Sequence, residues 1–262
     1  MRLVPTLVLV LLSAALLPAT VQAHEFFVVP RGDAGKAAPV IVEAQAAHVF
    51  LRSAEVEKAD NVRVELLAAD GKRQPLTLSP GTASKALEGT ITGPVSGPAW
   101  LVGHRLPEVW SATTEGVLPG DRAALEAQGK TVRSVGRYEK FAKTALVPGG
   151  DAAFWSRPLG QTLEIVPLAP LDALKAGDVL PLQVLLDGKP VPQAEVGVSH
   201  EGYSEEEDAY KQILRTDAEG RVSLRPDAPA LWLARVAVTR PAKDATGADE
   251  ENLRATLLFP VK

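Results

Sequence analysis

The chain of 262 residues contains no cysteine, and its only methionine is the first residue. These absences exclude disulfides, iron–sulfur clusters, thiolate zinc sites, cysteine nucleophiles and thioether copper ligands. Aromatic residues are sparse at 5%, whereas 21 glycines and 21 prolines indicate many turns. The net charge of −4 provides no basic surface for nucleic acid or an anionic membrane. With 46% hydrophobic and 23% charged residues, the composition is that of a folded globular protein.

The only long hydrophobic run lies at the start of the chain. Arg2 precedes an apolar stretch over residues 7–17, Pro18 follows it, and small residues stand at Val21 and Ala23. This order predicts a secretory signal peptide over residues 1–23, and the run is shorter than the roughly 20 residues of a membrane span. We expect cleavage after Ala23 and a periplasmic or secreted protein that is not inserted in a membrane. His24 would then be its first residue.

The remaining sequence has the pattern of short strands separated by turns. Apolar and polar residues alternate, and turn signals occur at 70–71 (DG), 187–190 (DGKP) and 216–220 (TDAEG). We predict an all-β fold of two β-sandwich domains, 24–155 and 160–262, the second immunoglobulin- or transthyretin-like. A short helix is expected over 121–128 in the first domain, with Asp121 as its cap. Periodicity leaves residues 133–147 open between helix and strand.

Histidine is the residue type that points most directly to chemistry. A histidine at a new amino terminus offers its α-amine and a ring nitrogen to one metal ion, and nitrogen donors suit nickel, cobalt, copper or zinc. The predicted mature chain has four histidines, and we expect His104 and His200 to lie at strand ends, where they could converge with the terminus. We predict His24 and His104 as the first metal ligands, with His200 and His48 as the third and fourth.

Signatures of other functions are missing from the sequence. It has no phosphate-binding glycine loop, dinucleotide fingerprint, HExxH pair or GxSxG motif, so we do not expect an enzyme with ordinary side-chain catalysis. The acidic run over residues 205–208 (EEED) lacks the ligand spacing of a calcium loop, and we interpret it as a solvated loop that could attract cations.

Several sequence segments carry a resemblance to a known family. They are residues 23–27 (AHEFF), 48–53 (HVFLRS), 103–111 (GHRLPEVWS), 139–143 (EKFAK), 159–161 (LGQ), 163–168 (LEIVPL), 185–190 (LLDGKP) and 200–204 (HEGYS). With them the chain resembles a family of exported proteins classed as a domain of unknown function, whose members are often labelled as periplasmic components of nickel or cobalt uptake. The resemblance implies a membrane metal-uptake transporter as the partner.

Three hypotheses about function follow from these residues. The first is a periplasmic protein that binds nickel, cobalt or a similar divalent transition metal and assists its uptake, with His24 as a ligand. The second is a non-enzymatic two-sandwich protein that binds a partner protein or a glycan through its loops. The third is a copper oxidase in which the terminal amine and two imidazoles hold copper, with His24 joined by His104 or His200.

Overall fold

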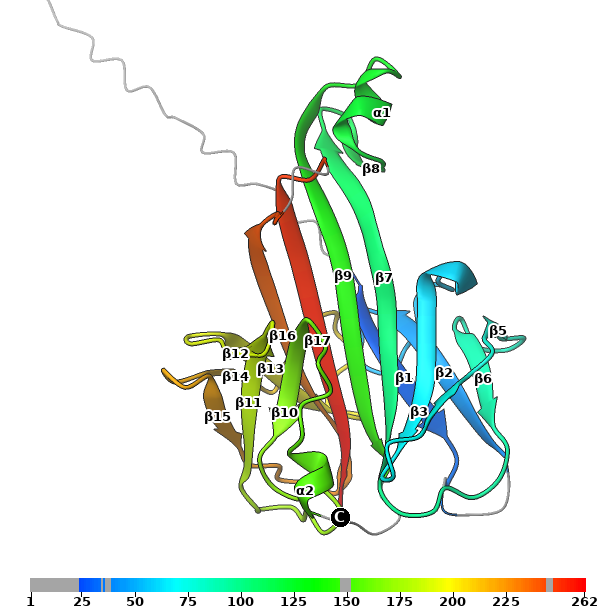
Figure 1. The fold of residues 1–262 in the computed structure, drawn as a ribbon, viewed down its shortest axis with the longest axis vertical. Coiled ribbons are helices and arrows are strands. Elements are labelled where there is room, and N and C mark those ends of the chain that lie inside the picture. Colours follow the sequence, from blue (N-terminus) through cyan, green and yellow to red (C-terminus); the bar gives the residue numbers. More distant parts are fainter. Residues whose placement is uncertain (1–23, 34, 36–38, 147–151, 244–246) are drawn as a thin grey trace, which may run out of the picture.

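The computed structural model describes residues 24–33, 35, 39–146, 152–243 and 247–262, and the predicted signal peptide lies outside them. Strands make up 54% of the chain and helices 5%, which confirms the all-β prediction (Figure 1). No helix in these residues is long and apolar enough to cross a membrane.

A large sheet of nine strands forms the centre of the molecule. Its strand order is β14-β13-β16-β17-β9-β7-β3-β4, and β8 pairs with the far end of β7. Neighbouring strands are antiparallel except β17 and β9, which are parallel. The strands are β3 (Val62–Ala68), β4 (Arg73–Pro75), β7 (Ala99–Thr113), β8 (Gly116–Pro119), β9 (Val132–Leu146), β13 (Glu195–His200), β14 (Gln212–Arg215), β16 (Ala230–Pro241) and β17 (Glu250–Val261).

Two four-stranded sheets accompany the large one. The first has the order β1-β2-β6-β5, and in the second β11 pairs with β10, β12 and β15. Their strands are β1 (Glu25–Arg31), β2 (Val40–Ala47), β5 (Ser79–Pro80), β6 (Leu87–Ile91), β10 (Leu163–Pro167), β11 (Leu180–Leu186), β12 (Lys189–Pro190) and β15 (Arg221–Leu224).

The two small sheets cover opposite faces of the large sheet, because successive side chains of a strand point to opposite sides. In β7, Trp100 and Val102 pack in one core with β10 and β11, whereas Ala99 and Leu101 pack in another core with β1 and β2. Figure 1 shows β10 in front of the large sheet and β1 and β2 behind it. Each sandwich core is therefore formed against one face of a shared sheet.

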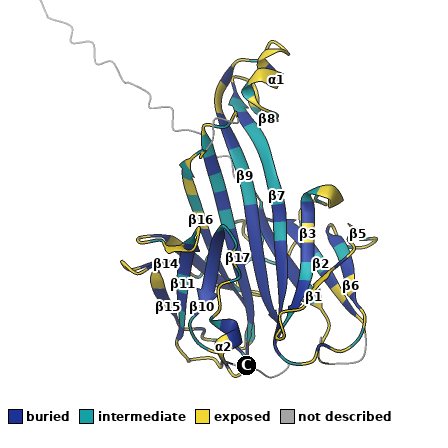
Figure 2. Cartoon of the chain, in the orientation of Figure 1, coloured by how far each residue is buried: buried dark blue, intermediate teal, exposed yellow. Residues whose placement is uncertain are grey.

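The helices are short, and the two α-helices lie toward opposite ends of the molecule (Figure 1). The α1 helix (Arg122–Glu126) begins after Asp121, whose carboxylate accepts a hydrogen bond from Ala124 N at 2.8 Å, as predicted for the cap. It sits at the exposed tip of the long β7–β9 hairpin (Figure 2). The others are η1 (Ala59–Asn61) and α2 (Ala152–Trp155). The segment that periodicity left open is the strand β9.

Candidate metal centre

His24 and His48 lie side by side because of the register between β1 and β2. The two strands are antiparallel and pair Glu25 with Ala47, so the next position along brings residue 24 opposite residue 48. The imidazole centroids are 4.3 Å apart and the ring planes are inclined by 42°. The structure thus joins the predicted terminal histidine to one of the other three predicted ligands.

The start of β1 is held firmly on the large sheet, which fixes the position of His24. The buried carboxylate of Glu25 accepts hydrogen bonds from Arg235 in β16, at 2.7 Å, and from Arg254 in β17. The hydroxyl of Thr256 donates to the carbonyl of Phe26 at 2.7 Å. Charge-assisted bonds of this kind are stronger than neutral ones, so the candidate site rests on an ordered element.

Two carboxylates accompany the histidine pair. Glu55 Oε1 lies 3.1 Å from His24 Nδ1, and Asp208 Oδ2 lies 3.5 Å from His48 Nδ1. Within the described chain, His48 Nδ1 is buried and makes no hydrogen bond, although the side chain as a whole is 17% exposed. A buried nitrogen without a hydrogen bond is a cost that a bound cation would remove.

The backbone around the site adopts unusual conformations. Leu51 has a φ of 63° and Asp208 a φ of 49°, both in the left-handed region that non-glycine residues seldom occupy. The turn at Leu51 reverses the chain so that Glu55 pairs with Ala46 of β2. The backbone N–H of Asp208 donates to the carbonyl of His48 at 3.0 Å. Strain of this kind gathers at functional sites, where it places particular side chains.

The electrostatic surroundings favour a neutral His24 ring. Partial burial lowers the pKa of the imidazole below its ordinary value, and the opposing attraction of Glu55 and Glu57 does not reverse this. The neighbouring charges of His48 and Lys140 add to the decrease. Only a neutral imidazole has a lone pair to give to a metal, so this environment prepares the ring as a ligand.

The acidic run over residues 205–208 lies beside His48. Its last residue, Asp208, contacts His48, and Glu205 forms an ion pair with Arg52. The loop therefore adds negative charge at the edge of the histidine pair, where it would attract cations.

The other two predicted ligands lie on the opposite face of the large sheet. His104 shares the face of Trp100 and Val102, stacks on Phe141 at 5.0 Å, and its Nε2 lies 2.7 Å from Glu139 Oε1. The four histidines therefore do not converge. The expected pairing of His24 with His104 is replaced by a pairing with His48.

His200 packs on Trp232, with centroids 4.8 Å apart, on the same face of the large sheet as His104. Its Nδ1 lies 2.9 Å from the carbonyl of Glu201. The histidine ends β13, as predicted.

His104 does not lie at a strand end, contrary to our expectation from its neighbours. The strand β7 continues through Gly103, His104 and Pro107 to Thr113. Gly103 instead allows β1 to approach closely, and Pro107 lies in an irregularity of register between Arg105 and Glu108. Proline is tolerated in strands at such bulges because it has no N–H to donate.

Within the described residues, no group of three or more histidine, aspartate or glutamate side chains is arranged to hold a metal ion. The sequence contained a signal for the observed pair that we did not use. If the run 26–29 pairs as a hairpin with the following strand in the observed register, Glu25 opposite Ala47, residues 24 and 48 meet.

Comparison with known proteins places the chain in a family. Residues 21–240 match the family described as "Domain of unknown function (DUF4198)". The chain belongs to this family. No curated protein matches it. Among solved structures it is similar to the D0-D1 domain of Intimin, with 13% sequence identity over 91% of this chain and 99% of that chain and a TM-score of 0.22.

Proposed function

We propose that this protein is an exported transition-metal-binding protein of the nickel or cobalt type, whose metal is held at His24 and His48. The observation that carries the proposal is the contact between the two imidazoles, 4.3 Å apart, at the residue that cleavage after Ala23 would make the amino terminus. A single surface histidine would be weak support for a metal site. Two adjacent imidazoles beside two carboxylates form a metal site when one further donor joins them.

The further donor is the α-amine of His24. Side chains alone do not form a three-ligand cluster among the described residues. Cleavage would add an amine with a pKa of about 8, which a metal ion can deprotonate at neutral pH. Amine, His24 ring and His48 ring give three nitrogen donors, and Glu55 is 57% exposed and can reorient as an oxygen donor. Such a set suits nickel, cobalt, copper or zinc better than calcium or magnesium.

A role in metal uptake is supported by the surroundings of the site and by the family resemblance. The acidic loop at Asp208 increases the local concentration of cations. Members of the family that the chain resembles are often labelled as components of nickel or cobalt uptake, and a membrane transporter would be the recipient of the metal.

The test is a calorimetric titration with nickel, cobalt, copper and zinc on two preparations. One is exported and cleaved so that it begins at His24, and the other carries an additional methionine before His24. We expect tight binding of one metal ion to the first and a loss of at least about tenfold in the second. Equal binding by both preparations would contradict the role of the amine.

Histidine variants of the cleaved protein give a matched control. His48→Ala should weaken binding as much as blocking the terminus does, because it removes the second imidazole. His104→Ala and His200→Ala should leave the affinity unchanged, because these side chains lie on the other face of the large sheet. Loss of binding in His104→Ala with normal binding in His48→Ala would refute the assignment.

A second candidate function, a copper oxidase, is favoured by the same pair. A terminal amine with two imidazoles is the donor set of the copper site that we considered above, with His48 now in place of His104 or His200. The copper-loaded protein would then consume a reductant and produce hydrogen peroxide from oxygen. Copper binding without peroxide production would eliminate this candidate and leave the first one standing.

A further inference from the structure

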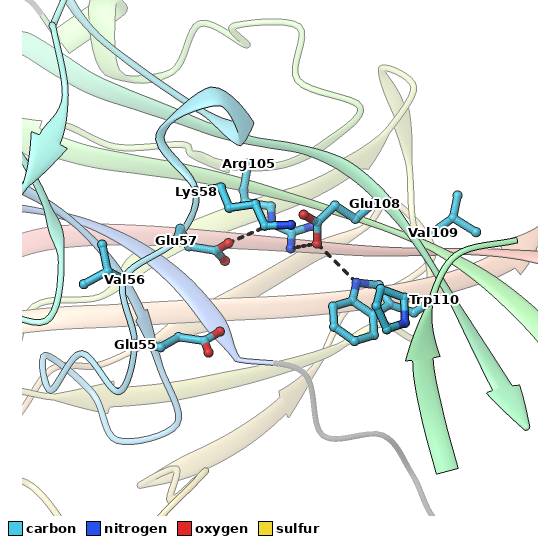
Figure 3. Close-up of a pocket in the computed structure, with 9 residues that line it drawn as sticks. Glu55, Val56, Glu57, Lys58, Arg105, Glu108, Val109 and Trp110 are labelled. Carbon is cyan, nitrogen blue, oxygen red and sulfur yellow. Dashed lines mark hydrogen bonds and ion pairs between the residues drawn. The ribbon is translucent and has the colours of Figure 1, made fainter. Parts of the chain in front are cut away.

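A cavity of about 380 Å³ lies beside the candidate metal centre (Figure 3). It is bordered by one apolar group of residues, Val56, Val109, Trp110 and Pro119, and by one charged group, Glu55, Glu57, Lys58, Arg105 and Glu108. A bare metal ion does not need a cavity of this size, which is in the range of small-molecule sites.

The cavity and the candidate centre share a residue. Glu55 lines the cavity and its carboxylate lies 3.1 Å from His24 Nδ1. In Figure 3 the blue ribbon of β1 begins next to this carboxylate. Glu55 therefore links the cavity to the candidate centre at His24. This inference rests on the proposed function.

Hydrogen bonds and ion pairs connect most of the charged wall. Arg105 is buried and bonds both Glu57, at 3.4 Å, and Glu108. The indole N–H of Trp110 donates to the same Glu108 carboxylate at 3.2 Å. Together these bonds hold the carboxylates and the indole in fixed positions, as a binding site requires.

Lys58 is the charge that remains available in this wall. It is exposed and makes no ion pair within the described part of the chain, although it is near enough to Glu108 to contribute to lowering the pKa of that carboxyl. One available ammonium can take one carboxylate, while three glutamates disfavour an anion of higher charge. The apolar group around Trp110 can take a hydrocarbon or aromatic side chain.

We propose that the cavity binds a small amino-acid-type chelator that arrives together with the metal ion. Its carboxylate pairs with Lys58, its side chain packs against Trp110, and its nitrogen donors complete the coordination of the metal at His24. The protein would then capture a metal complex, and the chelator would occupy coordination positions that the protein leaves open.

The experiment uses the cleaved protein that begins at His24, with nickel(II) as the metal and L-histidine as the probe. The protein is titrated first with nickel alone and then with the nickel–histidine complex, and bound histidine is counted after gel filtration. We expect a ternary complex that retains histidine. Citrate, a chelator of higher negative charge, should remove nickel and not be retained.

Two variants and one control locate the chelator. Lys58→Ala and Trp110→Ala should each weaken binding of the nickel–histidine complex about tenfold, the effect of losing one ion pair or one aromatic contact, and should leave binding of nickel alone within about twofold. Lys130→Ala, which removes a half-buried partner of Glu115 elsewhere on the long hairpin, should change neither affinity.

The outcomes separate this inference from the proposed function. If nickel binds alone but histidine removes it, or if Lys58→Ala retains histidine as well as the unmodified protein, the inference is overturned and the metal site stands. If only the nickel–histidine complex binds, the inference is supported and binding of the unaided ion is overturned. If neither binds, both are overturned.

Discussion

At the residue scale, a buried ion pair carries one clear prediction for stability. Lys143 Nζ donates to Glu164 Oε1 at 2.7 Å, and their side chains are 1% and 2% exposed. Glu164 also accepts hydrogen bonds from the backbone N–H groups of Leu159 and Gly160. Lys143→Met would leave a buried carboxylate without its counter-charge, so we expect a loss of about 3–5 kcal/mol in the free energy of unfolding by urea.

The control for this pair is an ion pair at the surface. Arg73 and Glu65 interact with side-chain exposures of 46% and 26%. Arg73→Met should cost less than about 1 kcal/mol because water screens the pair. Equal losses in Lys143→Met and Arg73→Met would show that burial does not determine the strength of these interactions.

Lys140 predicts a dependence of stability on pH. Burial lowers its pKa from 10.5 to about 8, against the attraction of Glu57. Between pH 8 and pH 10.5 the unfolded chain binds a proton at Lys140 that the folded chain does not. The free energy of unfolding therefore increases as pH rises through this range. This contribution is at most about 3 kcal/mol, and below the folded-state pKa it is absent.

The measurement is urea unfolding of the unmodified protein and of Lys140→Met over this pH range. Other titrating groups affect both proteins, so the difference between the two isolates Lys140. We expect the free energy of unfolding of Lys140→Met, minus that of the unmodified protein, to be largest below pH 8. This difference should decrease as pH rises toward 10.5, because the neutral lysine no longer costs free energy in the folded protein. Parallel curves would contradict the lowered pKa.

At the element scale, Gly103 determines how closely β1 approaches the large sheet. A Cβ at this position would lie 2.4 Å from Val28 Cγ2 and 2.9 Å from Phe26 Cε1, both in β1. Gly103→Ala should therefore push β1 outward and destabilise the protein by about 1–3 kcal/mol, as overpacking does. The substitution should increase the rate of amide hydrogen exchange in β1 and β2 more than in β10 and β11. Unchanged stability with unchanged exchange would contradict this role.

The elements also show how far the sequence alone leads. The Asp70-Gly71 signal correctly predicted the turn between β3 and β4, and Gly71 has the expected positive φ of 85°. The sequence did not assign the strand β9, because its last residues, 140–146, are buried on both faces. Apolar and polar residues therefore do not alternate along this part of the strand. The same limit applies to the candidate site. The local sequence was enough to propose His24 as a metal ligand, whereas its contact with His48 depends on how two separate strands pair.

At the scale of the whole molecule, the parallel pairing of β17 with β9 joins the two halves of the chain. Nine consecutive residue pairs, from Glu250 opposite Gly136 to Leu258 opposite Thr144, connect a strand of the second predicted domain to one of the first. The predicted domain boundary between residues 155 and 160 stays a prediction. A change of pattern along the chain does not show that the parts on its two sides fold separately. Sequence patterns report single strands, and they contain little information about which distant strands share a sheet.

This shared sheet predicts that the protein unfolds as one unit. Separation of the halves would expose the paired edges of β9 and β17 and the buried side chains on both faces, so partial unfolding should be unfavourable. Hydrogen exchange measured by mass spectrometry at increasing urea should give the same midpoint for β3 and β13, which lie toward opposite edges of the sheet. Ala255→Pro, within the paired region of β17, should reduce the stability of both. Two separate midpoints in the unmodified protein would instead show that the parallel pair is a weak contact between independently stable domains.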